Sequence, residues 1–395
     1  MAIVVTGIGA RTPLGCSYEE CLDNLRKGTP CVGDIENYCT DGYEMTAAGE
    51  IRHGGKVVRT PSDVDRKVHF YGQALCELGR KTRFSERYRP DELMLNVGGG
   101  VDYFDFDSYM QVRNLEAIHH KMNAEMRDLA LSYGIRAGCH LFSSACTASA
   151  HAIGFSLRIL RRNLAGAVIT GGADSMIAHL SFLGFYKLGA LSMSEDASAF
   201  KCKPCDLHAD GTVLSEASVA IMMENSDNVP SDIPILAEVA GYGCTMDAYA
   251  VTEPEPSGEQ AAKAIEAALA DAGIGPDDID CIHIHGTGTP KCGPAEYAAL
   301  KRVFGDRTES IPVYSMKGQV GHAIGSCTAV EMIGVIHSLA AQEVLPTVNF
   351  NTPNPAAPLR LITGSPLGMP IRYVLKINSA FGGHNTALIL KKWEK

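Results

Sequence analysis

The sequence predicts an α/β fold made of two similar halves. Short apolar runs typical of buried strands alternate with amphipathic helical stretches along all 395 residues, of which 46% are hydrophobic. A stretch containing proline and serine at 229–234 separates two such series. In each series a strand leads through a loop into a helix of small residues, which indicates an internal duplication. We therefore expect two domains, 1–234 and 235–395, packed as one body.

The first half begins at once with an apolar strand and continues with helices and strands in turn. Ser17 precedes a helix that carries Cys21, Leu22 and Leu25 on one face. Glycines follow two of the strands directly, as expected where a chain turns tightly. The expected strands are 3–5, 93–97, 141–142, 167–170 and 219–223.

The second half repeats this alternation. Ser257 and Gln260 have the spacing of a capping box, so they predict the start of a helix that Gly273 ends. Another helix is expected from about His322. The expected strands are 235–240, 281–285, 312–314, 373–378 and 386–390.

Composition excludes several classes of partner. The formal net charge of −10 argues against generic binding to nucleic acid or to an anionic membrane. The N-terminus lacks the layout of a signal peptide, and we expect no apolar stretch near the roughly 18 residues that span a bilayer. The 13 cysteines are scattered, as is typical of free thiols in a reducing compartment. We expect a cytoplasmic protein.

Cys146 lies where a short apolar run gives way to a helix of small residues. A thiol at such a turn meets the free N–H groups and the dipole of a helix N-terminus, which stabilise the nucleophilic thiolate. Taken alone, a buried structural cysteine is the better interpretation, since most free cysteines are inert. The second half of the chain supplies the residues that favour a nucleophile.

Three strings in the second half carry candidate reactive groups. His285 ends an alternating strand and enters a turn rich in glycine and threonine. Lys317 and His322 share a tight loop before a helix. The third string, 378–385, joins two strands through adjacent glycines that permit unusual backbone angles. A single histidine or lysine in such a place is ordinary, but these three strings and the Cys146 string in this order are not expected by chance.

Together these strings resemble the active site of the elongating 3-oxoacyl-acyl-carrier-protein synthases, the condensing enzymes of type II fatty acid and polyketide synthesis in the thiolase superfamily. The resemblance runs through almost the whole chain and implies the thiolase fold, with two α/β halves in five αβαβα layers. It implies that Cys146 accepts the acyl group and that His285, His322 and Lys317 complete a Cys-His-His-Lys set. The initiating synthases resemble Cys-His-Asn sites instead, so the elongating class is favoured.

The resemblance also assigns supporting residues. Glu331 matches the glutamate that pairs with the lysine. Phe381 matches a gating phenylalanine whose backbone N–H joins that of Cys146 in an oxyanion hole. Thr287 and Thr289 are candidates to contact the phosphopantetheine arm, which arrives on the acyl carrier protein, so no soluble cofactor is expected.

The implied reaction is decarboxylative condensation of a cysteine-bound acyl chain with malonyl-carrier protein, which yields 3-oxoacyl-carrier protein and CO₂. The implied partners are an acidic acyl carrier protein and a second subunit, in a homodimer or in a ketosynthase heterodimer with a chain-length-factor-like partner. Arg66, Lys67 and Lys203 fall near the family's carrier-protein docking surface, with ordinary surface charges as the alternative. Two other functions remain open: a non-catalytic subunit that shapes a partner's pocket, and a thiolase-like enzyme acting on coenzyme A esters.

The chain departs from the family pattern in several places. The string 212–218 carries side chains where the family has two glycines, so the backbone near Cys146 is expected to differ. The segment 114–133 is polar where the family usually lines an acyl pocket. A solvated helix face is the favoured interpretation, and a polar pocket or partner interface is the alternative. Cys202 and Cys205 have a zinc-like spacing but lack a second pair of ligands, so no metal site is expected.

Overall fold

Ten strands form the framework, five from each half of the chain. A computed structural model describes residues 2–61, 64–100, 121–177 and 179–394. The first half contributes β1 (Ile3–Arg11), β6 (Leu93–Gly99), β7 (Gly138–Ser143), β8 (Ala167–Ser175) and β9 (Leu214–Asn225). The second half contributes β10 (Ala237–Met246), β11 (Cys281–His283), β12 (Pro312–Tyr314), β16 (Tyr373–Ser379) and β17 (His384–Lys391).

The two halves share one topology. The first half runs β7-β6-β8-β9-β1 across its sheet, and the second runs β12-β11-β16-β17-β10. If the five strands of each half are numbered in chain order, both halves have the spatial order 3-2-4-5-1. In both, the third, second and fourth strands are parallel and the last two pairings are antiparallel. The halves meet where β1 pairs with β10, and the proposed division at 234–235 falls just before β10.

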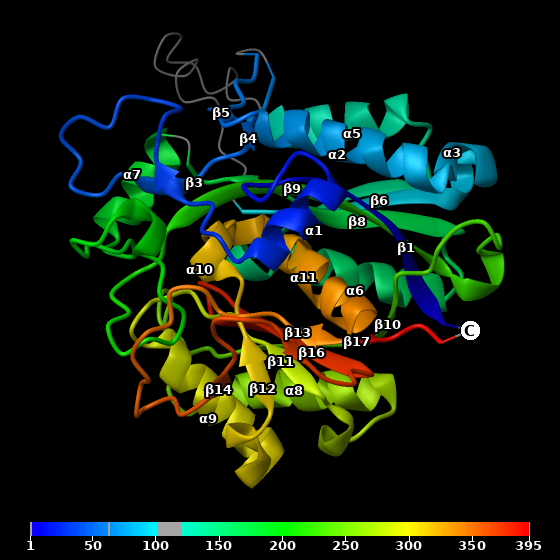
Figure 1. Cartoon of the computed structure of the whole chain (residues 1–395). Helices are drawn as coiled ribbons and strands as arrows, with labels where there is room; N and C mark the ends of the chain where they lie inside the picture. The colour runs from blue at the N-terminus through cyan, green and yellow to red at the C-terminus, as the bar shows by residue number, and fades with distance from the viewer. Residues whose placement is uncertain (1, 62–63, 101–120, 178, 395) are drawn as a thin grey trace.

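Helices cover both faces of each half, which gives the five αβαβα layers that the resemblance implied (Figure 1). The outer layer on the first half contains α2 (Arg66–Thr82) and α5 (Lys121–Ser132), and the outer layer on the second contains α8 (Glu259–Ala272) and α9 (Cys292–Phe304). Between the sheets lie α6 (Ala148–Arg161) and α11 (Cys327–Ala341), whose apolar side chains form the largest core cluster. The prediction of two similar α/β halves is confirmed.

Helix ends show where local sequence signals were sufficient. The predicted helix after Ser17 forms as α1 (Tyr18–Lys27), and the Ser17 hydroxyl accepts the backbone N–H of Glu20. The predicted capping box at Ser257 was wrong, because α8 starts from Gly258 and the Ser257 hydroxyl donates to Glu255. Gly273 ends α8 with a positive φ of 68°, as predicted.

The central helix α11 corrects one expectation. Residues Ile324–Ala341 are long and apolar enough to span a bilayer, so the expectation of no such stretch was wrong. In the fold, however, 89% of that stretch is buried between the two sheets, as in the core helix of a soluble protein. Its hydrophobicity therefore serves packing within the protein.

Part of the polar segment 114–133 lies outside the described residues, namely 114–120. Residues 121–132 form α5, whose buried face carries Met122 and Met126 against α2. Its opposite face, with Arg127 and Asp128, is exposed. For this described part, the favoured interpretation of a solvated helix face agrees with the structure.

Shorter elements complete the described chain. They are β2 (Gly33–Asp34), β3 (Ala47–Gly49), β4 (Arg52–His53), β5 (Lys56–Val57), α3 (Phe84–Arg87), α7 (His179–Lys187), α10 (Lys317–Val320), β13 (Glu343–Val344), β14 (Arg360–Leu361), β15 (Leu367–Gly368), and the 3₁₀ turns η1 (Pro90–Glu92), η3 (Ala145–Thr147), η4 (Ser198–Phe200), η5 (Ser226–Asn228), η6 (Pro276–Asp278), η7 (Gly305–Glu309) and η8 (Ile324–Ser326).

Candidate active site

Cys146 lies on a tight turn between strand β7 and helix α6. The turn is the 3₁₀ segment η3, and Ala145 just before the cysteine has a φ of 48°. Small residues at the start of α6 let the helix approach the sheet closely: a Cβ on Gly98 of β6 would lie 2.2 Å from the backbone nitrogen of Ser149. Cys146 is thereby held at the helix N-terminus with only 5% of its surface exposed.

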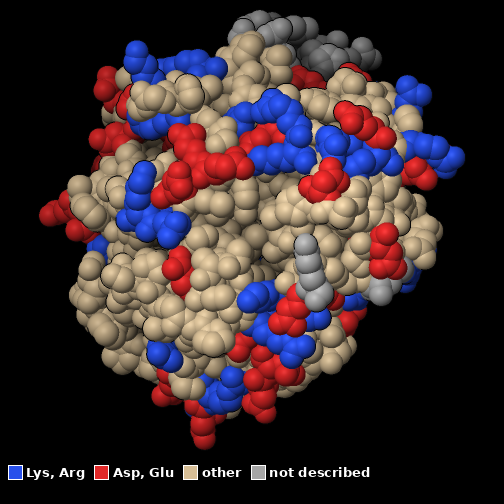
Figure 2. All heavy atoms as spheres, turned by 45° about the vertical axis from the view of Figure 1, so that its right-hand side comes forward, with Lys and Arg blue, Asp and Glu red and all other residues tan. Residues whose placement is uncertain are grey.

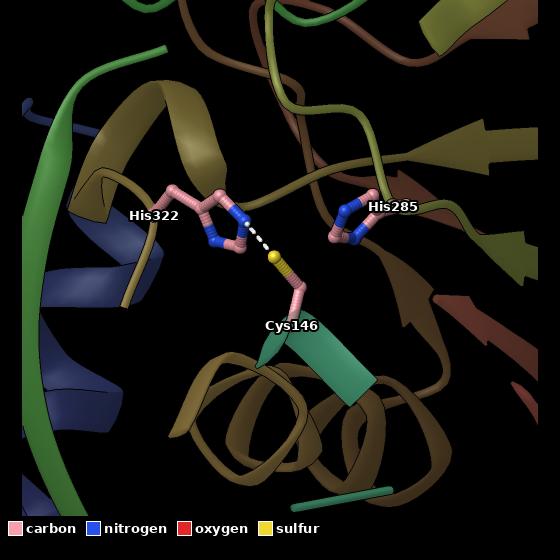
Figure 3. A group of neighbouring side chains, drawn as sticks. All are labelled: Cys146, His285 and His322. Atoms are coloured by element: carbon pink, nitrogen blue, oxygen red, sulfur yellow. Dashed lines mark hydrogen bonds between the residues drawn. The ribbon is translucent and has the colours of Figure 1, made fainter. Parts of the chain in front are cut away.

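His322 faces the cysteine directly. Its Nε2 lies 3.0 Å from the Cys146 Sγ (Figure 3). The histidine backbone is fixed by the string 212–218, because His322 N donates to Val213 O at 2.7 Å and Ser215 N donates to His322 O at 3.0 Å. The other ring nitrogen, Nδ1, has no hydrogen-bond partner in the described part of the chain. Nε2 is therefore placed to exchange a proton with the thiol.

His285 approaches the sulfur from the end of β11. Its ring lies 5.2 Å from that of His322, centroid to centroid, at 82° (Figure 3). Its Nδ1 faces two donors, the Lys317 Nζ at 3.3 Å and the Asn378 Nδ2 at 3.1 Å. Thr328 donates to Asn378 Oδ1, which orients that amide. Since Nδ1 must accept, the proton of neutral His285 resides on Nε2, where it can be donated to a substrate.

The reactive atoms of Cys146, His285 and His322 all lie within 4.8 Å of one another. One thiol and two imidazoles are also ligand types that zinc prefers. The Lys317 ammonium beside His285 opposes a divalent cation there, and Nδ1 of that ring is already engaged. The set is better suited to proton and acyl transfer.

Behind His285 lies a buried charge cluster. Lys317 donates to Glu331, as the resemblance implied, and also to the His285 carbonyl oxygen at 2.6 Å. A second ammonium, Lys376 of β16, was not predicted from the sequence and pairs with the other Glu331 oxygen at 2.9 Å. Asn378, also not predicted as a site residue, donates to that oxygen at 3.1 Å.

The surroundings set the protonation states of these groups. Burial first, and then the Lys317 charge, lower the pKa of both His285 and His322 well below its usual value, so both rings are neutral. Burial opposes ionisation of Glu331, but the charges of Lys317 and Lys376 outweigh it and lower its pKa. The expected stabilised thiolate was not found, because burial and the neighbouring Cys327 raise the pKa of Cys146. Formation of a thiolate at Cys146 would therefore require loss of the thiol proton, and His322 Nε2 is the nearest acceptor, 3.0 Å from the sulfur.

Phe381 and the turn around it complete the surroundings of the sulfur. The Phe381 backbone N–H faces the Cys146 thiol and partly offsets the rise in its pKa, and the Phe381 ring stacks on Phe185 with centroids 6.1 Å apart. An open cavity of about 310 Å³ leads to the cysteine and is lined by residues of both halves. Thr287 and Thr289 line it, with their hydroxyls 2.8 Å apart.

A buried carboxylate shapes the turn that carries these threonines. Glu296 accepts the backbone N–H of His285 at 2.5 Å and that of Gly286 at 3.0 Å. Burial raises the pKa of Glu296. Glu296 was not predicted as a site residue, and the structure shows that it orients the His285 backbone.

The three basic residues assigned to carrier-protein docking do not fit that prediction well. Arg66 makes two hydrogen bonds of 2.6 Å to buried Glu216, and Lys67 is only 7% exposed. Lys203 pairs with Asp196 at 2.5 Å, and 13% of its side chain is exposed. On the face that Figure 2 shows, basic side chains lie across the upper part with acidic side chains between and beside them. Sequence position alone could not show which way these side chains point.

Cys202 and Cys205 are both buried, and neither belongs to a metal-ligand cluster among the residues described. The Cys202 thiol points to the carbonyl oxygen of Thr287 at 3.6 Å. Burial raises the pKa of Cys202 to about 12, so it remains a thiol. Cys202 thus packs beneath the Thr287 turn, and Cys205 packs against Gly293 of α9.

Comparison with family models gives two matches. Residues 113–228 match the model described as the beta-ketoacyl synthase N-terminal domain, and residues 236–351 match the C-terminal domain of the same family. Together they cover more than half of the chain.

Curated relatives match over the whole length. The chain is 28% identical to a 3-oxoacyl-[acyl-carrier-protein] synthase 2 of Staphylococcus aureus (strain COL), covering 99% of this chain and 98% of the relative. It is also 28% identical to the synthase of the same name from Synechocystis sp., with the same coverage.

Solved structures show the same fold. A type II polyketide ketosynthase in complex with its acyl-carrier protein superposes with a TM-score of 0.91 at 24% identity, covering 100% of this chain and 99% of that chain. The ishigamide ketosynthase/chain length factor gives 0.87 at 25% identity with the same coverage. A beta-ketoacyl synthase from Burkholderia phymatum gives 0.85 at 26% identity and covers both chains fully.

Proposed function

The chain belongs to the beta-ketoacyl synthase family, and from that premise we infer that it condenses a Cys146-bound acyl chain with malonyl-carrier protein to give 3-oxoacyl-carrier protein and CO₂. The observation that carries this proposal is the meeting of one thiol and two neutral imidazoles at the end of a single cavity. Each of the three has a separate task in the reaction.

The first step loads the acyl chain. His322 Nε2, 3.0 Å from the sulfur, takes the thiol proton as sulfur attacks the acyl thioester of the carrier protein. The carrier thiol leaves and receives that proton. The backbone N–H groups of Cys146 and Phe381 are the candidate donors to the oxyanion of the tetrahedral intermediate.

The second step forms the carbon–carbon bond. Malonyl-carrier protein loses CO₂, and the electron pair of the broken bond becomes an enolate. The Nε2–H of His285 is available to the enolate oxygen because Lys317 and Asn378 occupy Nδ1. The enolate carbon then attacks the Cys146 thioester, and the sulfur leaves as the 3-oxoacyl product forms.

We also propose the partners and the setting. An acyl carrier protein delivers both substrates on its phosphopantetheine arm, which passes Thr287 and Thr289, so the protein needs no separate soluble cofactor. The enzyme acts in the cytoplasm as a homodimer or beside a chain-length-factor-like subunit. The second arrangement is supported by the likeness to the ishigamide ketosynthase/chain length factor.

Acyl loading tests this function directly. Incubation with a panel of acyl-carrier proteins followed by intact mass spectrometry should show one acyl group on Cys146. A Cys146→Gln variant should lose condensation by at least ~10³-fold while still releasing CO₂ from malonyl-carrier protein. A Cys39→Ser variant, which removes an exposed thiol, is the matched control and should retain both activities. Condensation that survives in Cys146→Gln would exclude the proposed nucleophile, and loading by coenzyme A esters alone would favour a thiolase-like enzyme.

A further inference from the structure

Lys376 is a lysine in the centre of a core strand. Val374, Lys376 and Asn378 alternate along β16 and point to the central helices, whereas Leu375 and Ile377 point to the outer core. Lys376 is 1% exposed, and its Nζ contacts Glu331 Oε2 at 2.9 Å and Ile377 O at 2.6 Å. Burial of an ammonium ion carries a desolvation penalty of several kcal/mol, so a residue used only for packing is not expected to be lysine.

The ion pairs around Glu331 are unbalanced. Two ammonium groups share one carboxylate, since Glu331 is the only acidic side chain that bonds either Lys317 or Lys376 among the described residues. Glu296, the next carboxylate, accepts two backbone N–H groups instead. Burial lowers the pKa of Lys376 below its usual value, and the ion pair with Glu331 opposes that shift. When Lys376 is protonated, it and Lys317 place an excess of positive charge around Glu331, behind His285.

We propose that Lys376 is a positioning residue of this site: it shares Glu331 with Lys317 and adds a second buried positive charge that keeps His285 and His322 neutral during decarboxylation. The proposal rests on the proposed function, and it concerns how the two imidazoles stay unprotonated as the pH falls.

The groups that face this cluster come from every element around it. They are His283 and Cys281 of β11, Tyr314 of β12, Lys317 of α10, Cys327 and Glu331 of α11, Glu296 of α9, Cys146 of η3, and His285 and His322. Burial and the charges of both lysines lower the pKa of the three histidines. Burial and Glu331 raise the pKa of Cys327 to about 12, so it remains neutral.

Neutral imidazoles matter for the fate of the enolate. An imidazolium beside the enolate would transfer its proton to the carbanion carbon and give acetyl-carrier protein, so that CO₂ is lost without a new carbon–carbon bond. An imidazolium at His322 would also be unable to accept the Cys146 proton. A second cation suppresses both failures by repelling a further positive charge.

The test replaces Lys376 with methionine, which has a similar length and no charge. In Lys376→Met the acid limb of the condensation pH profile should move up by about one pH unit. The ratio of acetyl-carrier protein to 3-oxoacyl-carrier protein at pH 6 should rise by roughly tenfold. Lys391→Met, which breaks a surface pair with Glu238 on the neighbouring strand, is the control and should change neither measure.

The outcomes separate this proposal from the function itself. If the unmodified enzyme forms no 3-oxoacyl product, the proposed function fails. If it does, and a folded Lys376→Met variant shows an unchanged acid limb and product ratio, the role of Lys376 is overturned. Lys376→Arg, which keeps the charge, should restore both. If neither variant folds, NMR titration of the histidine side chains in the unmodified enzyme decides, since protonation of either active-site ring at the ordinary histidine pKa would overturn the proposal.

Discussion

The two halves of the molecule share a strand order but divide the chemistry. The first half supplies the sulfur of the proposed nucleophile, and the second supplies the two imidazoles and the buried charges next to them. A thiol has little desolvation penalty and needs only a defined turn, whereas ammonium and carboxylate groups need a buried network of partners. In this duplicated framework, the group with a small desolvation penalty and the groups with large desolvation penalties therefore lie in different halves.

The same turn occurs in both halves. In the first half β7 leads to η3 and then α6, and Ala145 has a φ of 48°. In the second half β12 leads, after α10, to η8 and then α11, and Ile324 has a φ of 40°. Gly325 occupies the place of Cys146. A Cβ on Gly325 would lie 2.3 Å from the backbone of Gly100, so the second turn has no room for a side chain.

The largest effect is expected from Glu331→Gln. Both buried ammonium groups lose their carboxylate, so the free energy of unfolding should fall by about 3–5 kcal/mol. Urea titration followed by circular dichroism measures it. Glu238→Gln breaks a partly exposed pair with Lys391 in the same half and should lower the stability by less than about 1 kcal/mol. Equal losses in the two variants would contradict the contrast between buried and surface charges.

Gly325→Ala should have the next largest effect. The added methyl group meets backbone atoms that cannot rotate away, which should destabilise the protein by about 2–3 kcal/mol and displace His322. Thermal unfolding and the rate of acyl loading report the two consequences. Gly184→Ala in α7, where nothing lies within 4 Å of the new Cβ, is the control and should be neutral or slightly stabilising. A neutral Gly325→Ala variant would show that the second turn is not constrained as described.

The smallest effect concerns the seam between the halves. His151 of α6 shares a 2.6 Å hydrogen bond with the Tyr242 hydroxyl of β10, and burial, with His384 and Arg158, lowers the pKa of His151 to about 4. The unfolded chain therefore binds a proton between about pH 6.5 and 4 that the folded protein does not bind, so acid favours unfolding.

In His151→Asn this contribution should disappear. The stability lost between pH 7 and 5 should shrink by roughly 1–2 kcal/mol, discounted for partial exposure of the ring. Urea midpoints at several pH values measure it. If the free energy of unfolding depended on pH equally in His151→Asn and the unmodified protein, His151 would not contribute to the loss of stability in acid.

Sequence patterns predicted the element types better than their lengths. The first strand was expected at 3–5, but β1 runs from Ile3 to Arg11 because Gly7 and Gly9 continue it. These glycines do not turn the chain; they let α2 pack closely, since a Cβ on Gly9 would lie 1.9 Å from Ala74 O. Distinguishing the two uses of glycine requires knowledge of what packs on the strand.

Lys376 shows why part of the site could not be predicted. A single lysine in an apolar strand favours a solvent-facing position, and nothing nearby in sequence indicates that α11 brings Glu331 opposite it. The resemblance to the family rested on strings that contain Cys146, His285, Lys317 and His322. Their side chains could therefore be expected to lie close together. The orientations of Arg66 and Lys67 depend on Glu216 and on the packing of α2, which are tertiary facts.

The central helix layer has a consequence for biosynthesis. About 165 residues separate the end of α6 from the start of α11, so at roughly 5–20 residues per second the ribosome needs about 10–30 s to supply the second helix. During that interval the inner face of the first sheet has only half of its cover. The nascent chain therefore exposes apolar side chains that α11 later covers, and chaperones can bind these side chains during that interval. The rate at which the codons for residues 162–326 are translated sets the length of the interval.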